Sequence, residues 1–411
     1  MPIRRSLAAL ALSAALLPAA DWPQYRGPNS DGTTSEAIPT SWPTDGLPLL
    51  WKIKMGEGFG SLAVAGPRAY VFAERGGEEA AVALDVATGK ELWSTALGKT
   101  IFEKSGGTGP RSTPTVDGEH VYLFGTYLRL SCLEAKDGKV LWSHDLGAEY
   151  SGQLNTGGIN NWGNAASPVV EGDLVIVAGG GAGQALMAFN KLTGALAWKG
   201  QDDKITHATA VPTTIANQQQ VVFFTQSGLA GVDGKGAVLW RAEFPFSTST
   251  AASPIIENGV VYCSAGYGVG GGAFAVAKEG AGWKATPLWR TKNENMNHWS
   301  TAVAKDGYVY GLFGFKEFKT EPLKCMDIKT GKILWSENGF GQGGTIIVAG
   351  NILVQGDQGQ LVLVKGAPDK YTELARAQVL TGKCWTMPVV ANGRIFCRST
   401  SQIVCLDAKA K

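Results

Sequence analysis

The sequence predicts an all-β fold, an eight-bladed β-propeller with four-stranded blades, whose ring is closed by pairing of its N- and C-terminal segments. The main observation is an internal repeat. The segment ALDVATGKELW at Ala83–Trp93 returns in similar form at Cys132–Trp142, Ala188–Trp198 and Cys325–Trp335. A period of roughly 40–50 residues built from short β-rich pieces is typical of propeller blades, which bury their faces only against neighbouring blades.

A second recurring segment comes before each copy of the first and predicts the two inner strands of a blade. It places runs of Val, Ile, Tyr and Phe on both sides of a short turn, as expected for a tight hairpin. The glycine in that turn supplies the positive φ that such a hairpin needs. The turns are Asp117-Gly118, Glu171-Gly172, Asn258-Gly259 and Asn392-Gly393.

The ALDVATGKELW pattern itself predicts the outer hairpin. The Asp side chain is expected to hydrogen-bond the backbone of its own turn, and the Gly to take the left-handed conformation. The pattern ends in a tryptophan, and we expect each indole to lie between adjacent blades with its N–H bonded to the neighbour. These residues are Trp51, Trp93, Trp142, Trp198, Trp240, Trp289 and Trp335.

Eight opening strands are predicted, and the last blade holds only three strands. The segment Pro48–Ile53 has the outer-strand pattern with no blade before it, so pairing of the two chain ends should complete the last blade and leave few open edges. The seventh blade departs from the pattern, because Tyr371–Arg376 has neither the Thr-Gly turn nor the Trp. The opening strands are expected near Gly60, Ser112, Ala166, Ala210, Ala252, Ser300, Thr345 and Thr386.

The chain is expected to divide into a signal peptide (1–20), an extended leader (21–47) and the propeller (48–411). Arg4 and Arg5 precede a short apolar run that ends in Pro18-Ala19-Ala20, the pattern of a secretory signal. The run is shorter than the roughly 20 residues that span a membrane. No cysteine follows it to carry a lipid. These features predict a mature protein in the periplasm or outside the cell. A monomer is expected.

The composition argues against two classes of partner. The 411 residues carry a formal charge of +2, with no long basic run, so neither nucleic acid nor membrane insertion is expected. Cys132, Cys263, Cys325 and Cys405 stand at small core positions of the repeat. A bridge between Cys384 and Cys397 is left open, and no metal site is predicted because the Cys and His spacing fits none.

The repeats resemble the pyrroloquinoline quinone (PQQ)-type repeat of eight-bladed quinoprotein propellers, over about residues 48–407. The leader motif at Asp21–Gly32 is similar to that of a group of exported PQQ-like proteins, and we expect it to form a strap over the propeller surface. Quinoprotein alcohol dehydrogenases of this type use PQQ, Ca²⁺, an adjacent cysteine pair and a catalytic Asp. This chain has no Cys-Cys pair and no assignable base. The related propeller lipoprotein of the outer-membrane β-barrel assembly machine uses no cofactor, but its lipidated cysteine is absent here.

The candidate site is the channel mouth, where residues just before each inner strand should meet. An arginine there is able to bind a carboxylate, and Trp385 or Trp299 to stack on a planar ring. The alternative is a hydrated mouth without a specific ligand. The predicted ring is Glu57, Arg111, Asn164, His207, Ser249, His298, Gln342 and Trp385.

The longest loop between blades, residues 147–164, is a second candidate, because function often lies on long loops of a rigid scaffold. Its Tyr150 and Trp162 are predicted to bind a partner; a solvated, glycine-rich loop is the alternative.

The leading hypothesis is an exported, non-catalytic binding or assembly scaffold that holds a protein partner or a small polar ligand at the channel mouth. The alternative is a PQQ-dependent oxidoreductase of the alcohol or sugar dehydrogenase type with an atypical site. No cofactor is assigned in the first case; PQQ with Ca²⁺ belongs to the second.

Overall fold

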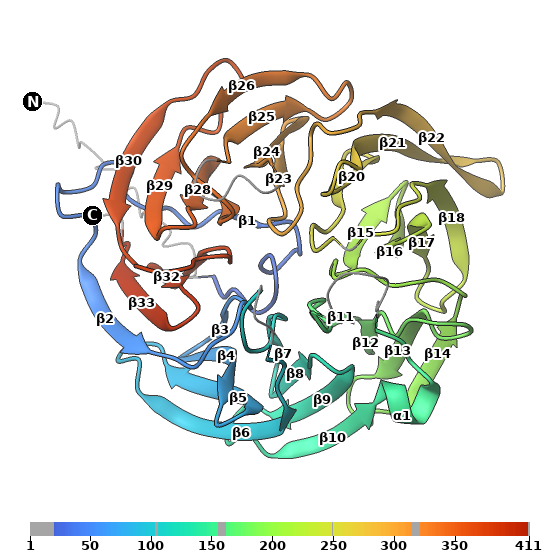
Figure 1. Ribbon diagram of the computed structural model, residues 1–411, viewed down its shortest axis with the longest axis horizontal. Helices are drawn as coiled ribbons and strands as arrows, with labels where there is room; N and C mark the ends of the chain where they lie inside the picture. Colours follow the sequence, from blue (N-terminus) through green and yellow to red (C-terminus); the bar gives the residue numbers. More distant parts are fainter. Residues whose placement is uncertain (1–19, 103–105, 155–161, 249, 315–320, 410–411) are drawn as a thin grey trace, which may run out of the picture.

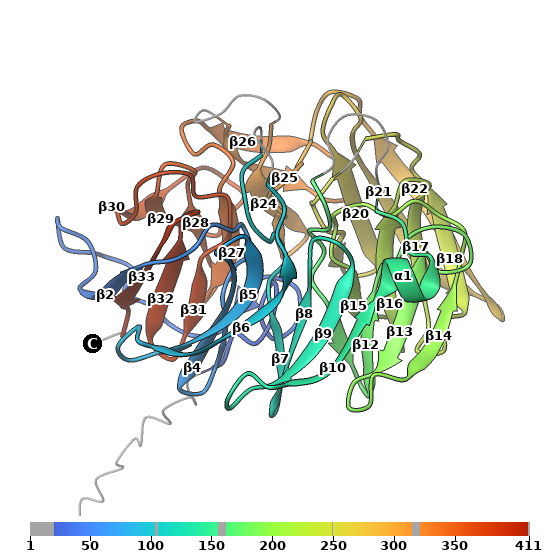
Figure 2. The ribbon, with the colours of Figure 1, turned by 60° about the horizontal axis from the view of Figure 1, so that its bottom comes forward.

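A computed structural model of the protein describes residues 20–102, 106–154, 162–248, 250–314 and 321–409. Eight sheets of antiparallel strands, one of them extended by a short parallel strand, stand around a central axis as the blades of a propeller (Figure 1). A single short helix in the described ranges, α1 (Leu146–Tyr150), lies on the outer rim (Figure 2). The predicted fold class and blade number are confirmed, and every opening strand begins within three residues of its predicted position.

The first four blades follow the chain in order, from the innermost to the outermost strand. Their strands are β3 (Ala63–Ala65), β4 (Arg68–Arg75), β5 (Glu78–Asp85) and β6 (Glu91–Lys99) in blade one; β7 (Thr115–Asp117), β8 (His120–Phe124), β9 (Arg129–Glu134) and β10 (Val140–Asp145) in blade two; β11 (Val169–Glu171), β12 (Leu174–Val177), β13 (Leu186–Asn190) and β14 (Leu196–Gly200) in blade three; β15 (Val211–Ile215), β16 (Gln218–Thr225), β17 (Gly228–Val232) and β18 (Val238–Glu243) in blade four.

The other four blades complete the ring, and two of them take a strand from the N-terminal part of the chain. Their strands are β19 (Ile255–Glu257), β20 (Val260–Ala265), β21 (Gly270–Glu279) and β22 (Gly282–Arg290) in blade five; β23 (Val303–Lys305), β24 (Tyr308–Leu312), β25 (Leu323–Asp327) and β26 (Ile333–Glu337) in blade six; β1 (Thr33–Thr34), β27 (Gly344–Val348), β28 (Asn351–Gln355), β29 (Gln360–Val364) and β30 (Glu373–Gln378) in blade seven; β31 (Val389–Ala391), β32 (Arg394–Arg398), β33 (Gln402–Asp407) and β2 (Leu49–Lys54) in blade eight.

The ring closes as predicted, because β2 pairs antiparallel with β33 and places Trp51 opposite Cys405. A second link at the same joint comes from Arg398, which is fully buried and donates to the carbonyl oxygens of Gly60 at 2.7 Å and Phe72 at 3.1 Å. Burial lowers the pKa of this guanidinium to about 9. The β2–β33 pairing thus closes blade eight, and the buried guanidinium of Arg398 holds blade eight to blade one.

The tryptophans join the blades as the sequence predicts. Each of six indoles donates its N–H to a backbone carbonyl of the next blade, at 2.8–3.2 Å. Trp240 is the exception, since it donates to Gln220 of its own blade at 2.5 Å. The six are Trp51, Trp93, Trp142, Trp198, Trp289 and Trp335.

Five of the six indoles also lie against a glycine of the following blade. At Gly331, for example, an added Cβ would lie 2.7 Å from the Trp289 ring. This glycine has φ +72°, so its turn conformation and the neighbouring indole both disfavour a side chain. The same contact, at 2.4–2.8 Å, occurs at Gly89, Gly138, Gly194 and Gly236.

The outer strand of every blade has a bulge just before the tryptophan position, so that one extra residue stands out of register. A bulge strengthens the local twist and makes an edge strand a poorer template for aggregation. Blade seven keeps the bulge at Leu374 although Ala375 stands where the Trp is expected.

The leader does more than lie over the surface as a strap. Trp22 is fully buried and exchanges two backbone hydrogen bonds with Val64 of blade one, at 2.7 and 2.9 Å. On the far side of the channel Arg26 donates to Ala302 of blade six at 2.6 Å, and β1 pairs with β27. The leader therefore crosses one end of the channel, and its dark blue trace passes near the middle of the ring in Figure 1.

The leader also covers blade seven, where the tryptophan is missing. Its Trp42 and Leu47 belong to the same apolar cluster as Leu374 and Ala375 of β30. Gly46 approaches this strand so closely that an added Cβ would lie 2.7 Å from the Cβ of Ala377. Apolar contact with the leader thus takes the place of the tryptophan in this blade.

All six cysteines are buried thiols. Cys132, Cys263, Cys325 and Cys405 occupy the predicted core positions. The bridge left open between Cys384 and Cys397 does not occur in this structure. In the described ranges no helix has the length and hydropathy to cross a bilayer.

Replacing Gly331 with Ala should lower the free energy of unfolding by about 1–3 kcal/mol more than replacing Gly172 with Ala. Both glycines have positive φ, but nothing lies within 4 Å of a Cβ at Gly172, so only Gly331→Ala presses on an indole. Urea denaturation of the two variants measures the difference. Equal losses would show that the indole contact does not hold adjacent blades together.

Candidate functional site

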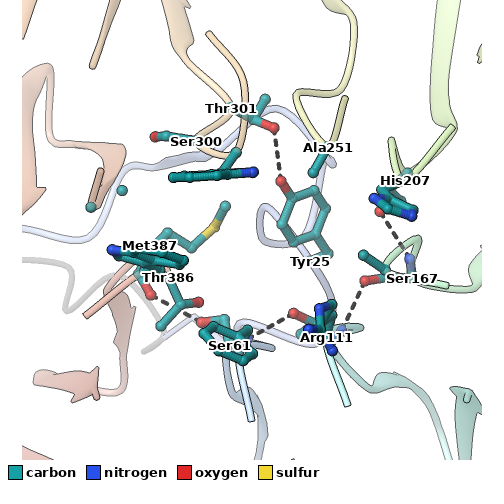
Figure 3. A pocket seen from close by; sticks show the side chains of 18 of the residues that line it. Tyr25, Ser61, Arg111, Ser167, His207, Ala251, Ser300, Thr301, Thr386 and Met387 are labelled. Carbon is teal, nitrogen blue, oxygen red and sulfur yellow. Dashed lines mark hydrogen bonds between the residues drawn. The ribbon is translucent and has the colours of Figure 1, made fainter. Parts of the chain in front are cut away.

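A cavity of about 500 Å³ lies on the propeller axis and is lined by side chains or backbone from all eight blades (Figure 3). Tyr25 of the leader lies among the lining residues, and its hydroxyl shares a 2.8 Å hydrogen bond with Thr301 of blade six. The leader thus forms the floor of the cavity at one end of the channel. The blade-joining loops surround the mouth at the other end.

The wall has two layers, because alternate residues of an extended segment point the same way. The mouth layer comes first along each blade, and the floor layer follows two residues later. The mouth layer is Phe59, Arg111, Ala165, His207, Trp299 and Trp385; the floor layer is Ser61, Thr113, Ser167, Thr209, Thr301 and Met387.

Hydroxyl groups of the floor layer join neighbouring blades. The backbone N–H of Ser61 donates to Thr113 Oγ1, that of Thr113 to Ser167 Oγ, and that of Ser167 to Thr209 Oγ1, each at 2.9 Å. Dashed lines in Figure 3 mark these bonds from blade to blade. The floor is therefore polar and fixed by the ring itself.

The mouth layer is aromatic on one side. Trp299 and Trp385 stack with ring centroids 4.6 Å apart and an interplanar angle of 21°. Lys383 places its Nζ 4.1 Å from the Trp385 ring, a cation–π contact. It also donates to Gly106 at 3.1 Å, so this cation is held at the cavity edge.

Arg111 stands beside the aromatic side and is oriented by its own loop. Its guanidinium donates to the carbonyl oxygens of Gly107 and Gly109, both at 3.0 Å. Its Cζ lies 5.1 Å from the Phe59 ring, and Lys383 lies 5.9 Å from the same ring. The cations of Arg111 and Lys383 thus both lie close to the Phe59 ring.

His207 contacts Trp162, with ring centroids 6.2 Å apart, and both residues line the cavity. Burial, and to a smaller extent the charge of Arg111, lower the pKa of His207 to about 4. His207 is therefore neutral at pH 7.

The structure places three of the predicted ring residues in the cavity wall, namely Arg111, His207 and Trp385. Glu57 is exposed outside the wall, and Ser249 lies outside the described residues. The other three are buried behind it.

These three side chains point away from the cavity. Each residue stands directly before a residue that lines the cavity, and two of the side chains are also turned by hydrogen bonds. Asn164 precedes Ala165 and donates to the backbone oxygen of Ala166 at 2.9 Å. His298 precedes Trp299, and burial lowers its pKa to about 3. Gln342 donates to the carboxylate of Glu321. The prediction that these three residues line the mouth is therefore off by one residue, because neighbouring residues of an extended segment point to opposite faces.

The two predicted partner residues lie far apart in the fold. Trp162 belongs to the cavity wall, whereas Tyr150 ends α1 on the outer rim and packs edge-on against Phe189, with centroids 5.7 Å apart. They do not form one surface.

Several site residues were not predicted: Phe59, Tyr267, Tyr25 and the whole floor layer. For the floor layer a signal was present, because Thr113, Ser167 and Met387 each stand directly before the proline that recurs at the start of the inner strand. Counting back two residues from that position gives the mouth layer.

Glu79 is a buried carboxyl group next to the site that the sequence did not reveal. Its side chain is 4% exposed, and it accepts hydrogen bonds from the backbone N–H and the hydroxyl of Thr126. Burial raises its pKa to about 7, against the opposing effects of Thr126 and the charge of Arg111.

The lining residues within the described part of the chain include no Asp, Glu or Cys. Across the same ranges no three His, Cys, Asp or Glu side chains gather closely enough to hold a metal ion. The wall offers stacking surfaces, hydroxyl groups, a neutral histidine and the cation of Arg111, with Lys383 at its edge, a set of groups suited to binding a planar anion.

A family model described as outer membrane protein assembly factor BamB matches residues 48–125 and 78–312. Among solved structures, the chain is similar to BamB from Moraxella catarrhalis, with a TM-score of 0.62 at 15% identity over 89% of this chain and 98% of that one. It is also similar to quinohemoprotein alcohol dehydrogenase from Comamonas testosteroni, with a TM-score of 0.53 at 12% identity over 95% and 81%. The computationally designed Ika8 protein gives a TM-score of 0.60 at 13% identity over 88% and 99%.

At these identities the likeness to solved structures shows the fold alone. No curated protein sequence matches the chain significantly. The site must therefore be interpreted from its own residues.

Glu79 should make the protein less stable as the pH rises. Its pKa in the folded protein, about 7, is above the ordinary 4.5. Its contribution to the free energy of unfolding is therefore fully present below about pH 4.5 and is lost as the pH rises through 7. Between pH 5 and pH 8 the wild-type protein should lose up to about 3 kcal/mol of unfolding free energy through Glu79, and the Glu79→Gln variant should not show this loss. Urea denaturation at both pH values tests this, and an unchanged pH dependence in the variant would contradict it.

Proposed function

The chain belongs to the PQQ-type repeat family whose model is described as outer membrane protein assembly factor BamB, and from this premise we propose that it is a non-catalytic binding scaffold whose ligand site is the central cavity. The observation that carries the proposal is the cavity itself, a pocket of about 500 Å³ with a floor of its own. Its volume falls in the range of small-molecule sites.

The chemistry of the wall favours a planar, anionic small molecule as the ligand. The Trp299–Trp385 pair offers a flat apolar surface, and Arg111 and Lys383 bring positive charge to the edge of that surface. Arg398 adds a third cation directly behind the wall, since it binds the carbonyl oxygen of Gly60, next to Phe59. Charges in a partly desolvated cavity attract an anion more strongly than the same charges in water.

The alternative function, a PQQ-dependent oxidoreductase, is favoured by the same planar surface and cations. Its fit is incomplete, because Ca²⁺ takes six to eight oxygen ligands, mostly from carboxylates and carbonyls. The described lining residues offer hydroxyl oxygens but no carboxylate, and no acidic side chain is placed to act as base. The residues suit the ring and acid groups of PQQ but not its calcium ion, so we derive no catalytic step.

The proposal includes export and a protein partner. Residues 1–20 are proposed to be removed as a signal peptide, leaving a monomeric mature chain in the periplasm or outside the cell. The description of the family as an assembly factor supports a protein partner, and Tyr150 on the outer rim is a candidate contact.

Titrating the mature protein with PQQ, with and without Ca²⁺, should give saturable quenching of tryptophan fluorescence that does not depend on Ca²⁺. Arg111→Gln should weaken the binding roughly 10-fold or more, because it removes a charged hydrogen bond to the acid group. The control is Arg241→Gln, which removes an exposed arginine outside the cavity.

Absence of PQQ binding at high micromolar concentration would contradict the planar-anion ligand. Binding that requires Ca²⁺, together with dye-linked oxidation of an alcohol or sugar, would replace the scaffold by the oxidoreductase.

The partner hypothesis has its own test. Affinity capture of proteins exported by the same cell should yield a partner with the wild-type chain that is lost with Tyr150→Ser. Tyr127→Ser is the control, because Tyr127 is an exposed tyrosine outside α1. If both variants retain the partner equally, Tyr150 does not belong to the interface.

A further inference from the structure

The floor layer contains three hydroxyl groups whose hydrogen atoms have no acceptor among the described residues. A hydroxyl has one donor and two acceptor positions. Thr113, Ser167 and Thr209 each accept a backbone N–H from the adjacent blade, which uses one acceptor position. Within the described ranges none of the three donates a hydrogen bond.

The other two hydroxyls of the floor layer have further partners in the protein. Ser61 donates to the backbone oxygen of Met387 at 3.0 Å, and Thr301 and Tyr25 share a 2.8 Å hydrogen bond in which either hydroxyl is able to donate. The three available donors therefore stand on consecutive blades, two to four, in a single sector of the floor.

The available donors are buried yet border the cavity. The residues Thr113, Ser167 and Thr209 are 2%, 4% and 6% exposed, and all three line the cavity. A buried donor without an acceptor is costly, typically about 1–3 kcal/mol. Three such donors around one space form a cradle for an acceptor oxygen.

Tyr25 completes this cradle from below and is held rigidly. The next residue, Arg26, has φ +64°, a conformation that is uncommon outside glycine and that often occurs at functional sites. The Arg26 guanidinium binds the backbone oxygens of Ser30, Asp31 and Ala302 at 2.6–3.1 Å. The strained and fully bonded turn fixes the Tyr25 ring at the floor of the cavity.

We propose that Thr113, Ser167 and Thr209, with Tyr25 as the floor, form an inner subsite that binds a hydrogen-bond acceptor oxygen, a ketone or carboxylate, at the inner end of the ligand. This rests on the proposed function and deepens it, since the ligand becomes a planar acid with its acid group at Arg111 and a second acceptor oxygen further in. A site built to hydrogen-bond a ligand rejects an analogue of the same shape without the acceptor, because its own buried groups stay unpaired.

The test uses two planar acids of nearly equal shape, 6-acetyl-2-naphthoate and 6-isopropyl-2-naphthoate, which differ in one carbonyl group. Calorimetric titration of the mature wild-type protein should show roughly 10-fold tighter binding of the acetyl compound. Ser167→Ala and Thr209→Val should each reduce this preference at least 3-fold and leave the affinity for the isopropyl compound unchanged. Thr209→Ser, which keeps the hydroxyl, should retain the preference.

Comparing two probes on the same variant removes any effect of lost stability, because a smaller folded fraction lowers both affinities equally. Arg111→Gln should weaken both probes to the same degree, since it contacts the acid group that they share.

The outcomes separate the two proposals. Equal affinity of the two probes for the wild type, or a preference that survives both Ser167→Ala and Thr209→Val, overturns the inner subsite and leaves the planar-acid ligand standing. Binding of neither probe overturns the planar-acid ligand and the inner subsite with it.

Discussion

The contact between a tryptophan of one blade and a bare glycine of the next is the interaction on which the ring depends. A four-stranded blade cannot bury its two faces alone, so its stability comes from its neighbours. The indole covers the outer part of the interface, and its N–H satisfies a carbonyl that would otherwise face an apolar surface, as Trp289 does for Ile328. The glycine opposite, Gly331, is required because any side chain would meet the ring.

The same constraint explains where the chain departs from its repeat. At blade seven the outer strand carries Ala375 in place of the indole, and the leader supplies the missing apolar cover through Trp42 and Leu47. At the closure of the ring the two ends of the propeller chain meet inside blade eight, where β2 and β33 are distant in sequence. There the pairing of β2 with β33 and the buried Arg398 hold the joint together.

Near the axis, hydroxyl groups rather than indoles connect the blades, and this determines what the cavity can offer. A Ser or Thr that accepts the N–H of the preceding blade has its hydrogen left to donate, so structural bonding and ligand recognition share the same atom. Residues outside the repeat add the rest: Arg111 and Lys383 from the loops before blades two and eight, and Tyr25 from the leader. The repeat thus builds the frame, and segments that differ between blades give the cavity its charge and depth.

The sequence by itself determined the fold, the blade number, the closure by chain ends and the roles of the tryptophans, because these follow from a local pattern written several times. It also identified Arg111, His207 and Trp385, which stand at the right distance from the inner strand. Tertiary structure decided the rest of the site. A strand turns alternate side chains to opposite faces, so a shift of one residue separates buried Asn164 and His298 from the cavity-facing Ala165 and Trp299. The position of Tyr25 depends on contacts with blades more than 270 residues away in sequence, as its bond to Thr301 shows, and no local pattern encodes such a contact.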